Sequence, residues 1–232
     1  FALLVYASAW LKRHYPGIYA CALLNSQPMG FYAPAQIVRD ARAHGVEVRP
    51  VSIADSFWDC TMEPTPETES AGGLALRLGF RQIAAMREEE AHWIVAARGN
   101  GYRHVDDVWR RAGTPPALLE KLAEADAFAP LGLSRRDALW AAKALRAPGP
   151  LPLFAGDMDG EGIAEPEAHL PAMTEGEEVV EDYAALRLTL RTHPVALLRP
   201  WLTPASPPSP AASDHAAEPG ASPRTPGIFP AQ

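Results

Sequence analysis

The chain has 232 residues, of which 47% are hydrophobic and 21% are charged, so it can form a sizeable globular core. Its charge is uneven: residues 1–150 hold 17 Lys and Arg against 16 Asp and Glu, whereas residues 151–232 hold 4 against 12. Because a polyanion needs local positive charge, the acidic C-terminal third is excluded as a nucleic-acid surface. Any such surface must come from local patches in the first two-thirds.

Metal, disulfide and membrane functions find little support in the composition. Two cysteines, Cys21 and Cys60, suggest neither a disulfide framework nor a zinc site, and the seven histidines have no ligand spacing. We expect both thiols to be small buried groups of a reduced cytoplasm. The longest apolar run, residues 1–11, is shorter than a membrane span and follows no positive segment. No bound metal and no membrane partner are therefore expected.

The first sixty residues read as helices followed by a short strand. The predicted elements are helices over 1–15, 16–26 and 35–44 and an edge strand over 46–51. The first helix is apolar on all sides, which predicts burial in a larger body, and its start in mid-helix suggests a fragment. Residues 61–73 contain two Pro and two Gly, which is typical of a loop or linker.

The rest of the chain reads as short helices and then as irregular sequence. A short strand is expected over 74–78, and helices over 79–85, 88–98, 105–112, 116–125 and 134–146. A helix followed by a strand is expected over 177–190. The tail from residue 204 has 8 prolines in 29 residues, which predicts disorder.

Several stretches, in the same order, resemble one protein family. They are residues 7–16, 22–32, 36–42 and 45–50, then 76–83, 119–128, 176–183 and 193–194. Over about residues 1–200 the chain thereby resembles the C-terminal part of bacterial error-prone DNA polymerases of the C-family. The run from Gln27 to Tyr32 is similar to the error-prone branch and not to the main replicase.

The resemblance implies a mainly α fold: a helical fingers fragment with a small β element, then a tandem helix-hairpin-helix domain and a disordered, acidic and Pro-rich tail. The implied domains are the end of the fingers (1–60), a linker (61–73), the tandem helix-hairpin-helix domain (74–146), a flexible linker (147–176), the lead-in to a missing OB-type domain (177–203) and the tail (204–232). Truncation or a frameshift would explain the tail.

The implied activity is template-directed DNA synthesis opposite damaged or ordinary DNA in the bacterial cytoplasm. That chemistry uses two Mg²⁺ ions held by palm carboxylates, which in this family lie upstream of the fingers. No catalytic residue and no cofactor is therefore assigned to this chain, and it is expected to be inactive alone. The implied partners are a primer-template duplex, a sliding clamp and damage-response accessory proteins.

The second hairpin is the stronger candidate for DNA contact. A helix-hairpin-helix presents backbone N–H groups and a helix N-terminus to a phosphate, without reading sequence. Gly113 makes the predicted turn, Thr114 is the expected N-cap, and Pro115 suits the first helical turn. Arg110 and Arg111 lie just before the turn. The alternative is an ordinary turn between packed helices.

The first hairpin departs from the family pattern. Ala84, Ala85 and Met86 stand where a glycine is usual, and the next helix starts with three glutamates that repel phosphate. Arg81 and Arg87 are its nearby cations. Arg187, further on, also replaces a usual glycine.

Two other motifs favour plainer readings. Lys12 and Arg13 end the first predicted helix, where cations stabilise the helix dipole, although a phosphate role is the alternative. Residues 157–162 carry acids at calcium-loop spacing, but Ala168 stands where a glutamate is required, so a solvated linker is expected.

Three functions remain open from the sequence. The chain is part of a translesion polymerase, a free-standing non-catalytic helix-hairpin-helix module that binds DNA, or an inactive truncated gene product without DNA affinity. Duplex binding that weakens with salt separates the first two from the third.

Overall fold

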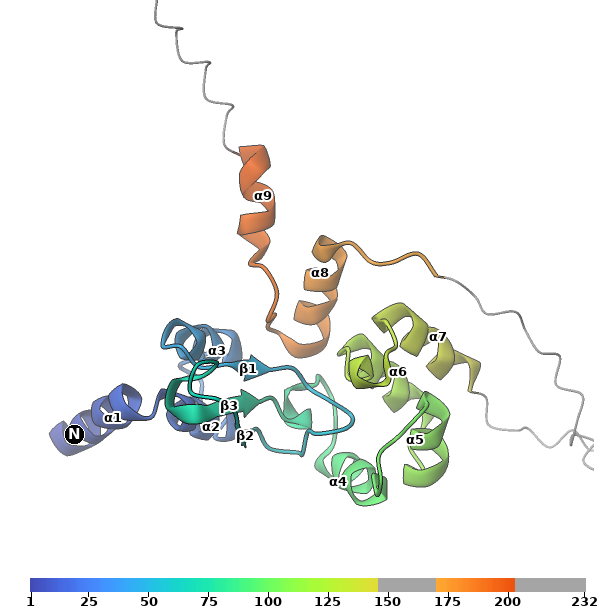
Figure 1. Ribbon diagram of the computed structural model, residues 1–232, viewed down its shortest axis with the longest axis horizontal. Helices are drawn as coiled ribbons and strands as arrows, with labels where there is room; N and C mark the ends of the chain where they lie inside the picture. The colour runs from blue at the N-terminus through green and yellow to red at the C-terminus, as the bar shows by residue number, and fades with distance from the viewer. Residues whose placement is uncertain (146–169, 203–232) are drawn as a thin grey trace, which may run out of the picture. The chain divides into compact units, whose positions relative to one another are not determined.

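The computed structural model describes residues 1–145 and 170–202, and Figure 1 shows the elements. One compact unit spans Phe1–Leu197, and a second unit begins at Leu198. The helices are α1 (Ala2–His14), α2 (Pro16–Asn25), α3 (Pro34–Ala43), α4 (Glu88–Ala97), α5 (Val105–Ala112), α6 (Pro116–Glu124), α7 (Arg135–Ala144), α8 (Glu175–Leu186) and α9 (Pro194–Leu202). The strands are β1 (Val48–Arg49), β2 (Thr61–Pro64) and β3 (Leu74–Arg77), and the short 3-10 turns are η1 (Ala71–Gly73), η2 (Phe80–Gln82) and η3 (Ala129–Leu131).

The predicted fold class is confirmed: the described chain is mainly helical, with one small sheet and a helix-hairpin-helix region. The strand order is β1-β3-β2, with β1 parallel and β2 antiparallel to the central β3. Leu76 in β3 lies opposite Val48 on one side and Met62 on the other. As predicted, β1 is an edge strand.

The prediction that residues 61–73 form a linker is wrong. Thr61–Pro64 form β2, which pairs with β3 along its whole length, and Ala71–Gly73 form η1. Proline is tolerated here because Pro64 ends an edge strand. The added strand gives β3 a partner on both sides, which a two-stranded sheet would lack.

Helix α1 presents its apolar side chains to solvent in this chain. None of its residues is buried, and Leu3 and Tyr6 are 78% and 68% exposed. Its contacts are with α2, and Lys12 reaches α3 to pair with Asp40 at 2.9 Å. The burial that was expected for this helix is therefore not provided by the described residues.

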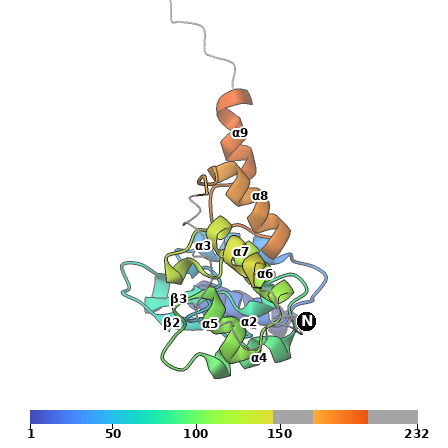
Figure 2. The same ribbon diagram turned by 90° about the vertical axis from the view of Figure 1, so that its right-hand side faces the viewer.

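The core runs without interruption from α2 to the end of α8. Its largest fully buried side chains include Phe80, Leu24, Leu119 and Phe128, and Leu188 belongs to the same cluster. Figures 1 and 2 show α8 beside α6, which agrees with the contacts between these helices. At about 25 cal/mol per Å² of apolar surface, such burial is the main stabilising contribution.

Buried ion pairs join α7 to α8. The Arg135 guanidinium, 3% exposed, contacts Glu178 at 3.2 Å and donates to Asp182. Thr189 donates to the same Asp182 carboxylate at 2.6 Å. The predicted helix near 177–190 is thus confirmed as α8, while the strand expected after it does not form among the described residues.

Several sequence predictions concern residues outside the described ranges. They are most of the 147–176 linker, the acidic loop 157–162 and the tail 204–232. No helix in the described part of the chain is both long and apolar enough to cross a membrane.

Candidate nucleic-acid interface

The second hairpin joins α5 to α6. Gly113 is the C-cap of α5, with a left-handed φ of 63°, and nothing lies within 4 Å of the position its Cβ would take. The prediction that Thr114 caps α6 is wrong: the N-cap is Pro115, and Thr114 is buried at 4% exposure. Pro115 has the extended backbone that an N-cap requires, so the cap moves one residue along the chain.

Two prolines weaken this helix start as a phosphate site. Pro115 and Pro116 occupy the N-cap and first helical position, and neither carries an N–H. The N–H of Leu118 donates to the Pro115 carbonyl at 2.9 Å. Of the four donors that a helix N-terminus normally offers, two are absent and one is used. Phosphate contact at this hairpin must therefore rely on side chains.

The two predicted arginines of α5 have different environments. Arg110 is 71% exposed and pairs with Asp106 at 3.0 Å, one helical turn earlier. Such an exposed pair is worth about 0–1 kcal/mol, so a phosphate can replace Asp106 as the partner. Arg111 instead donates to the carbonyls of Arg98 and Gly101, at 2.8 and 2.7 Å, and lies over the Tyr102 ring. Its role is to cap the end of α4.

Arg103 is an exposed cation that the sequence reading missed, and it lies at the start of α5, the end of that helix away from the second hairpin. It lines a hollow of about 580 Å³ with Arg111 and the loop Gly99–Gly101. Asp107 also lines the hollow and accepts from the Arg103 backbone N–H at 2.9 Å. That hydrogen bond lowers the pKa of Asp107, so the carboxylate stays ionised and caps α5.

The polar groups of the first hairpin are used inside the protein. Ala85 has a left-handed φ of 56°, the conformation that glycine adopts without strain. The Ala84 N–H donates to the Ala185 carbonyl at 2.9 Å, and the Ala85 carbonyl accepts from Lys121 at 3.1 Å. A hairpin whose backbone is engaged in this way is a packing element.

Of the two cations near the first hairpin, Arg81 is engaged inside the protein and Arg87 is exposed. Arg81 pairs with Asp59, donates to the Gln27 carbonyl at 3.1 Å and lies over the Trp58 ring. Arg87 is exposed at the start of α4, next to Glu88, Glu89 and Glu90. These three carboxylates complement the helix dipole but repel phosphate.

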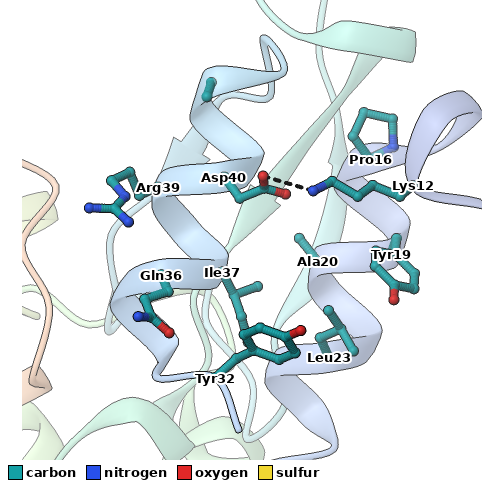
Figure 3. A pocket seen from close by; sticks show the side chains of 11 residues that line it. Lys12, Pro16, Tyr19, Ala20, Leu23, Tyr32, Gln36, Ile37, Arg39 and Asp40 are labelled. Carbon is teal, nitrogen blue, oxygen red and sulfur yellow. Dashed lines mark hydrogen bonds and ion pairs between the residues drawn. The ribbon is translucent and has the colours of Figure 1, made fainter. Parts of the chain in front are cut away.

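A groove separates α2 from α3 (Figure 3). It has a volume of about 580 Å³, an apolar floor that includes Ala20, Leu23 and Ile37, and the Lys12–Asp40 ion pair across one end. The Lys12–Asp40 pair is solvent-exposed like the Arg110–Asp106 pair, so it does not decide between the stabilising role and the phosphate role of Lys12. Arg39 and Gln36 project from the side of α3 that faces away from α2.

Nucleophilic and metal chemistry find no support in the described residues. Both cysteines are buried, and burial raises the pKa of Cys21 to about 11 and that of Cys60 above its usual range. No group of three or more His, Cys, Asp or Glu among the described residues could hold a metal ion. The Mg²⁺ pair of a polymerase therefore does not fit the described part of the molecule.

Comparison with known proteins agrees with the geometry. Residues 45–138 match the helix-hairpin-helix motif family. The chain is 64% identical over 200 residues to "Error-prone DNA polymerase" of Ruegeria pomeroyi, covering 86% of this chain and 18% of that protein. It is 56% identical over 206 residues to "Error-prone DNA polymerase 2" of Rhizobium meliloti, covering 86% and 19%. The chain thus spans about a fifth of the length of these relatives.

Proposed function

Because this chain is homologous to one segment of the error-prone DNA polymerases, as its sequence motifs indicate, we propose that it helps such an enzyme hold DNA during translesion synthesis. The contribution is sequence-independent contact with the phosphate backbone of a primer-template duplex. The reaction served is replication and repair synthesis after DNA damage, in the bacterial cytoplasm. A sliding clamp and accessory damage-response proteins are the partners we expect for the whole enzyme.

One observation carries this proposal: the residues that match the helix-hairpin-helix family fold around an open second hairpin with the exposed cation Arg110 beside it. Gly113 leaves the backbone accessible there, and Arg103 is a further exposed cation at the other end of α5. The first hairpin then serves as the structural member of the tandem pair. Side-chain cations replace the N–H donors that Pro115 and Pro116 lack.

The chemical step is assigned to other parts of the enzyme. In polymerases that use two metal ions, carboxylates hold the ions that activate the 3′-hydroxyl and stabilise the leaving pyrophosphate. We propose that the purified chain does not extend a primer, and that Mg²⁺ acts in a palm domain outside it. Extension of a primed template by this chain with Mg²⁺ would overturn that part of the proposal.

The DNA-binding part is tested by fluorescence anisotropy of a labelled duplex at several salt concentrations. Affinity should fall linearly with salt on logarithmic axes, and Arg110→Ala should reduce the slope by about 0.9, the value for one lost phosphate contact. Lys143→Ala, which removes an exposed cation from the last turn of α7, is the matched control and should leave the slope unchanged. Equal slopes for the wild type and Arg110→Ala would remove this residue from the interface.

A second candidate function is favoured by the missing donors at the second hairpin and the three glutamates at the first. It is either a free-standing non-catalytic helix-hairpin-helix module that binds DNA, or an inactive truncated gene product whose hairpins serve packing alone. Anisotropy that stays flat at low salt would select the inactive product. The free-standing module would be selected if the chain binds duplex in a salt-dependent manner but does not stimulate primer extension carried out by a full-length relative.

A further inference from the structure

The exposed cations of α3 meet the returning segment after α8 at a pocket that the sequence did not reveal. The pocket has a volume of about 500 Å³. One wall is formed by α3 and the other by residues on and after α8. Its charged or hydrogen-bonding residues are Gln36, Arg39 and Arg42 on α3 and Tyr183, Thr189, Arg191 and His193 on the returning segment.

The lining contains three arginines and no acidic residue. The charge of Arg191 is neutralised by acidic residues that do not line the pocket. It pairs with Asp126 and Glu178 at 3.1 and 3.2 Å and lies 3.7 Å from Asp182. The two arginines of α3 have no such compensation. Arg42 donates to the Leu190 carbonyl at 2.8 Å, which fixes its position without cancelling its charge. Arg39 is exposed and has no ion pair among the described residues.

The polar groups around these arginines are donors suited to an anion. His193 Nδ1 accepts the Val195 N–H at 3.2 Å, so the neutral ring carries its proton on Nε2 and can donate it. Tyr183 adds a phenolic hydroxyl, and Gln36 adds an amide. Arginine forks hold phosphate oxygens in two parallel hydrogen bonds. The pocket therefore combines positive charge with neutral donors, in a chain whose net charge is −7.

We infer that this pocket, defined by Arg39, Arg42 and His193, binds a phosphate group of the DNA backbone. The inference rests on the proposed function and gives it a second contact, on the fingers part instead of the hairpins. At the second hairpin Arg110 pairs with Asp106 and Arg111 donates to backbone carbonyls, whereas in the pocket Arg39 has no ion pair among the described residues. The pocket is also formed by residues far apart in the sequence, such as Arg42 and His193, and so includes part of the C-terminal third, which the charge distribution alone had excluded as a nucleic-acid surface.

The test uses the full chain and the same labelled duplex. Arg39→Ala removes an exposed side chain without an ion pair, so the fold should be unaffected, and duplex affinity at low salt should fall about tenfold, the effect of losing one charge-assisted hydrogen bond. Arg42→Lys keeps the charge but loses the fork, and should weaken binding less. Lys143→Ala is the control for net charge alone. If Arg39→Ala has no more effect than Lys143→Ala, the inference is overturned.

Two further measurements separate the possible sources of phosphate and the two contact sites. Pyrophosphate is titrated while the ¹⁵N shifts of the arginine Nε groups are recorded. If the shifts of Arg39 and Arg42 saturate with pyrophosphate while Arg39→Ala keeps its affinity for duplex, the pocket binds free phosphates. That result would overturn the DNA contact. A loss of affinity in Arg39→Ala but not in Arg110→Ala would support the pocket while removing the hairpin contact of the proposed function.

Discussion

Three non-glycine residues of the described chain hold a left-handed backbone, and two of them, Ala85 and Arg187, have exposed side chains, so replacing these two with glycine should stabilise the protein. Ala85 in the first hairpin has a φ of 56°, and Arg187, the C-cap of α8, has a φ of 60°. A side chain in this conformation costs about 1–2 kcal/mol. Glycine recovers that cost but loses about 0.4–1 kcal/mol through the greater freedom of the unfolded chain. The net gain expected is about 0.5–1 kcal/mol per site.

Both side chains are exposed, so little burial is lost in Ala85→Gly or Arg187→Gly. For a unit of this size, 1 kcal/mol corresponds to a rise in Tm of about 2–4 °C. The assay is thermal unfolding followed by circular dichroism, with urea unfolding to check that the slope m stays constant. The double variant should deviate from additivity, because the Ala84 N–H donates to the Ala185 carbonyl and so couples the two turns.

Ala96→Gly provides the matched control. Ala96 is an exposed residue inside α4, where φ is negative and glycine should cost about 1 kcal/mol. Ala85→Gly and Ala96→Gly thus differ in backbone conformation and not in kind of substitution. If Ala85→Gly lowers Tm as Ala96→Gly does, the strain argument is wrong and the first hairpin does not hold the left-handed turn.

Three further predictions concern the sheet and the ion pairs. Gly79→Ala should unfold the chain or cost several kcal/mol, because its Cβ would lie 2.3 Å from the Trp58 carbonyl oxygen, whereas Gly113→Ala should cost about 1 kcal/mol; chemical denaturation compares them. Arg135→Met should cost about 3 kcal/mol, because the buried carboxylates Glu178 and Asp182 would keep only Arg191 as a cation, and equal stability would show that Arg191 alone neutralises them. The hydrogen bond from Arg77 lowers the pKa of Glu63 below 4.5, so its contribution to stability is present above that pH and is lost as pH falls through the lowered value. Glu63→Gln should therefore flatten the acid dependence of stability, and an unchanged pH profile would contradict the assignment.

The sequence predicts local structure well where one signal decides it. Pro16 and Pro34 open α2 and α3 as expected, and Gly113 ends α5. The strand Thr61–Pro64 could not be predicted in this way, because the Pro and Gly residues between 64 and 73 are typical of a loop. Its stability comes from pairing with β3. Long-range pairing overrides local composition there.

The sequence predicted where the candidate site lies, but it could not predict which partner each arginine of the site would contact. Arg81, Arg110 and Arg111 look alike in the sequence, yet one pairs with Asp59, one is exposed and one caps α4. Which carbonyl or carboxylate lies within reach is decided by the fold. The Arg39 and Arg42 pocket depends on the return of the chain after α8, which no local pattern encodes.

The hydrogen bond between Arg42 and the Leu190 carbonyl joins residues 148 positions apart, and the Ala84 N–H likewise reaches Ala185. During synthesis the N-terminal helices leave the ribosome long before these partners exist. At about 5–20 residues per second, the interval is on the order of ten seconds. Helices α2 and α3 can form early, but the basic pocket closes only when the segment after α8 has emerged. This surface is therefore completed only after the segment that follows α8 has been translated, and a shorter nascent chain would lack the proposed phosphate pocket.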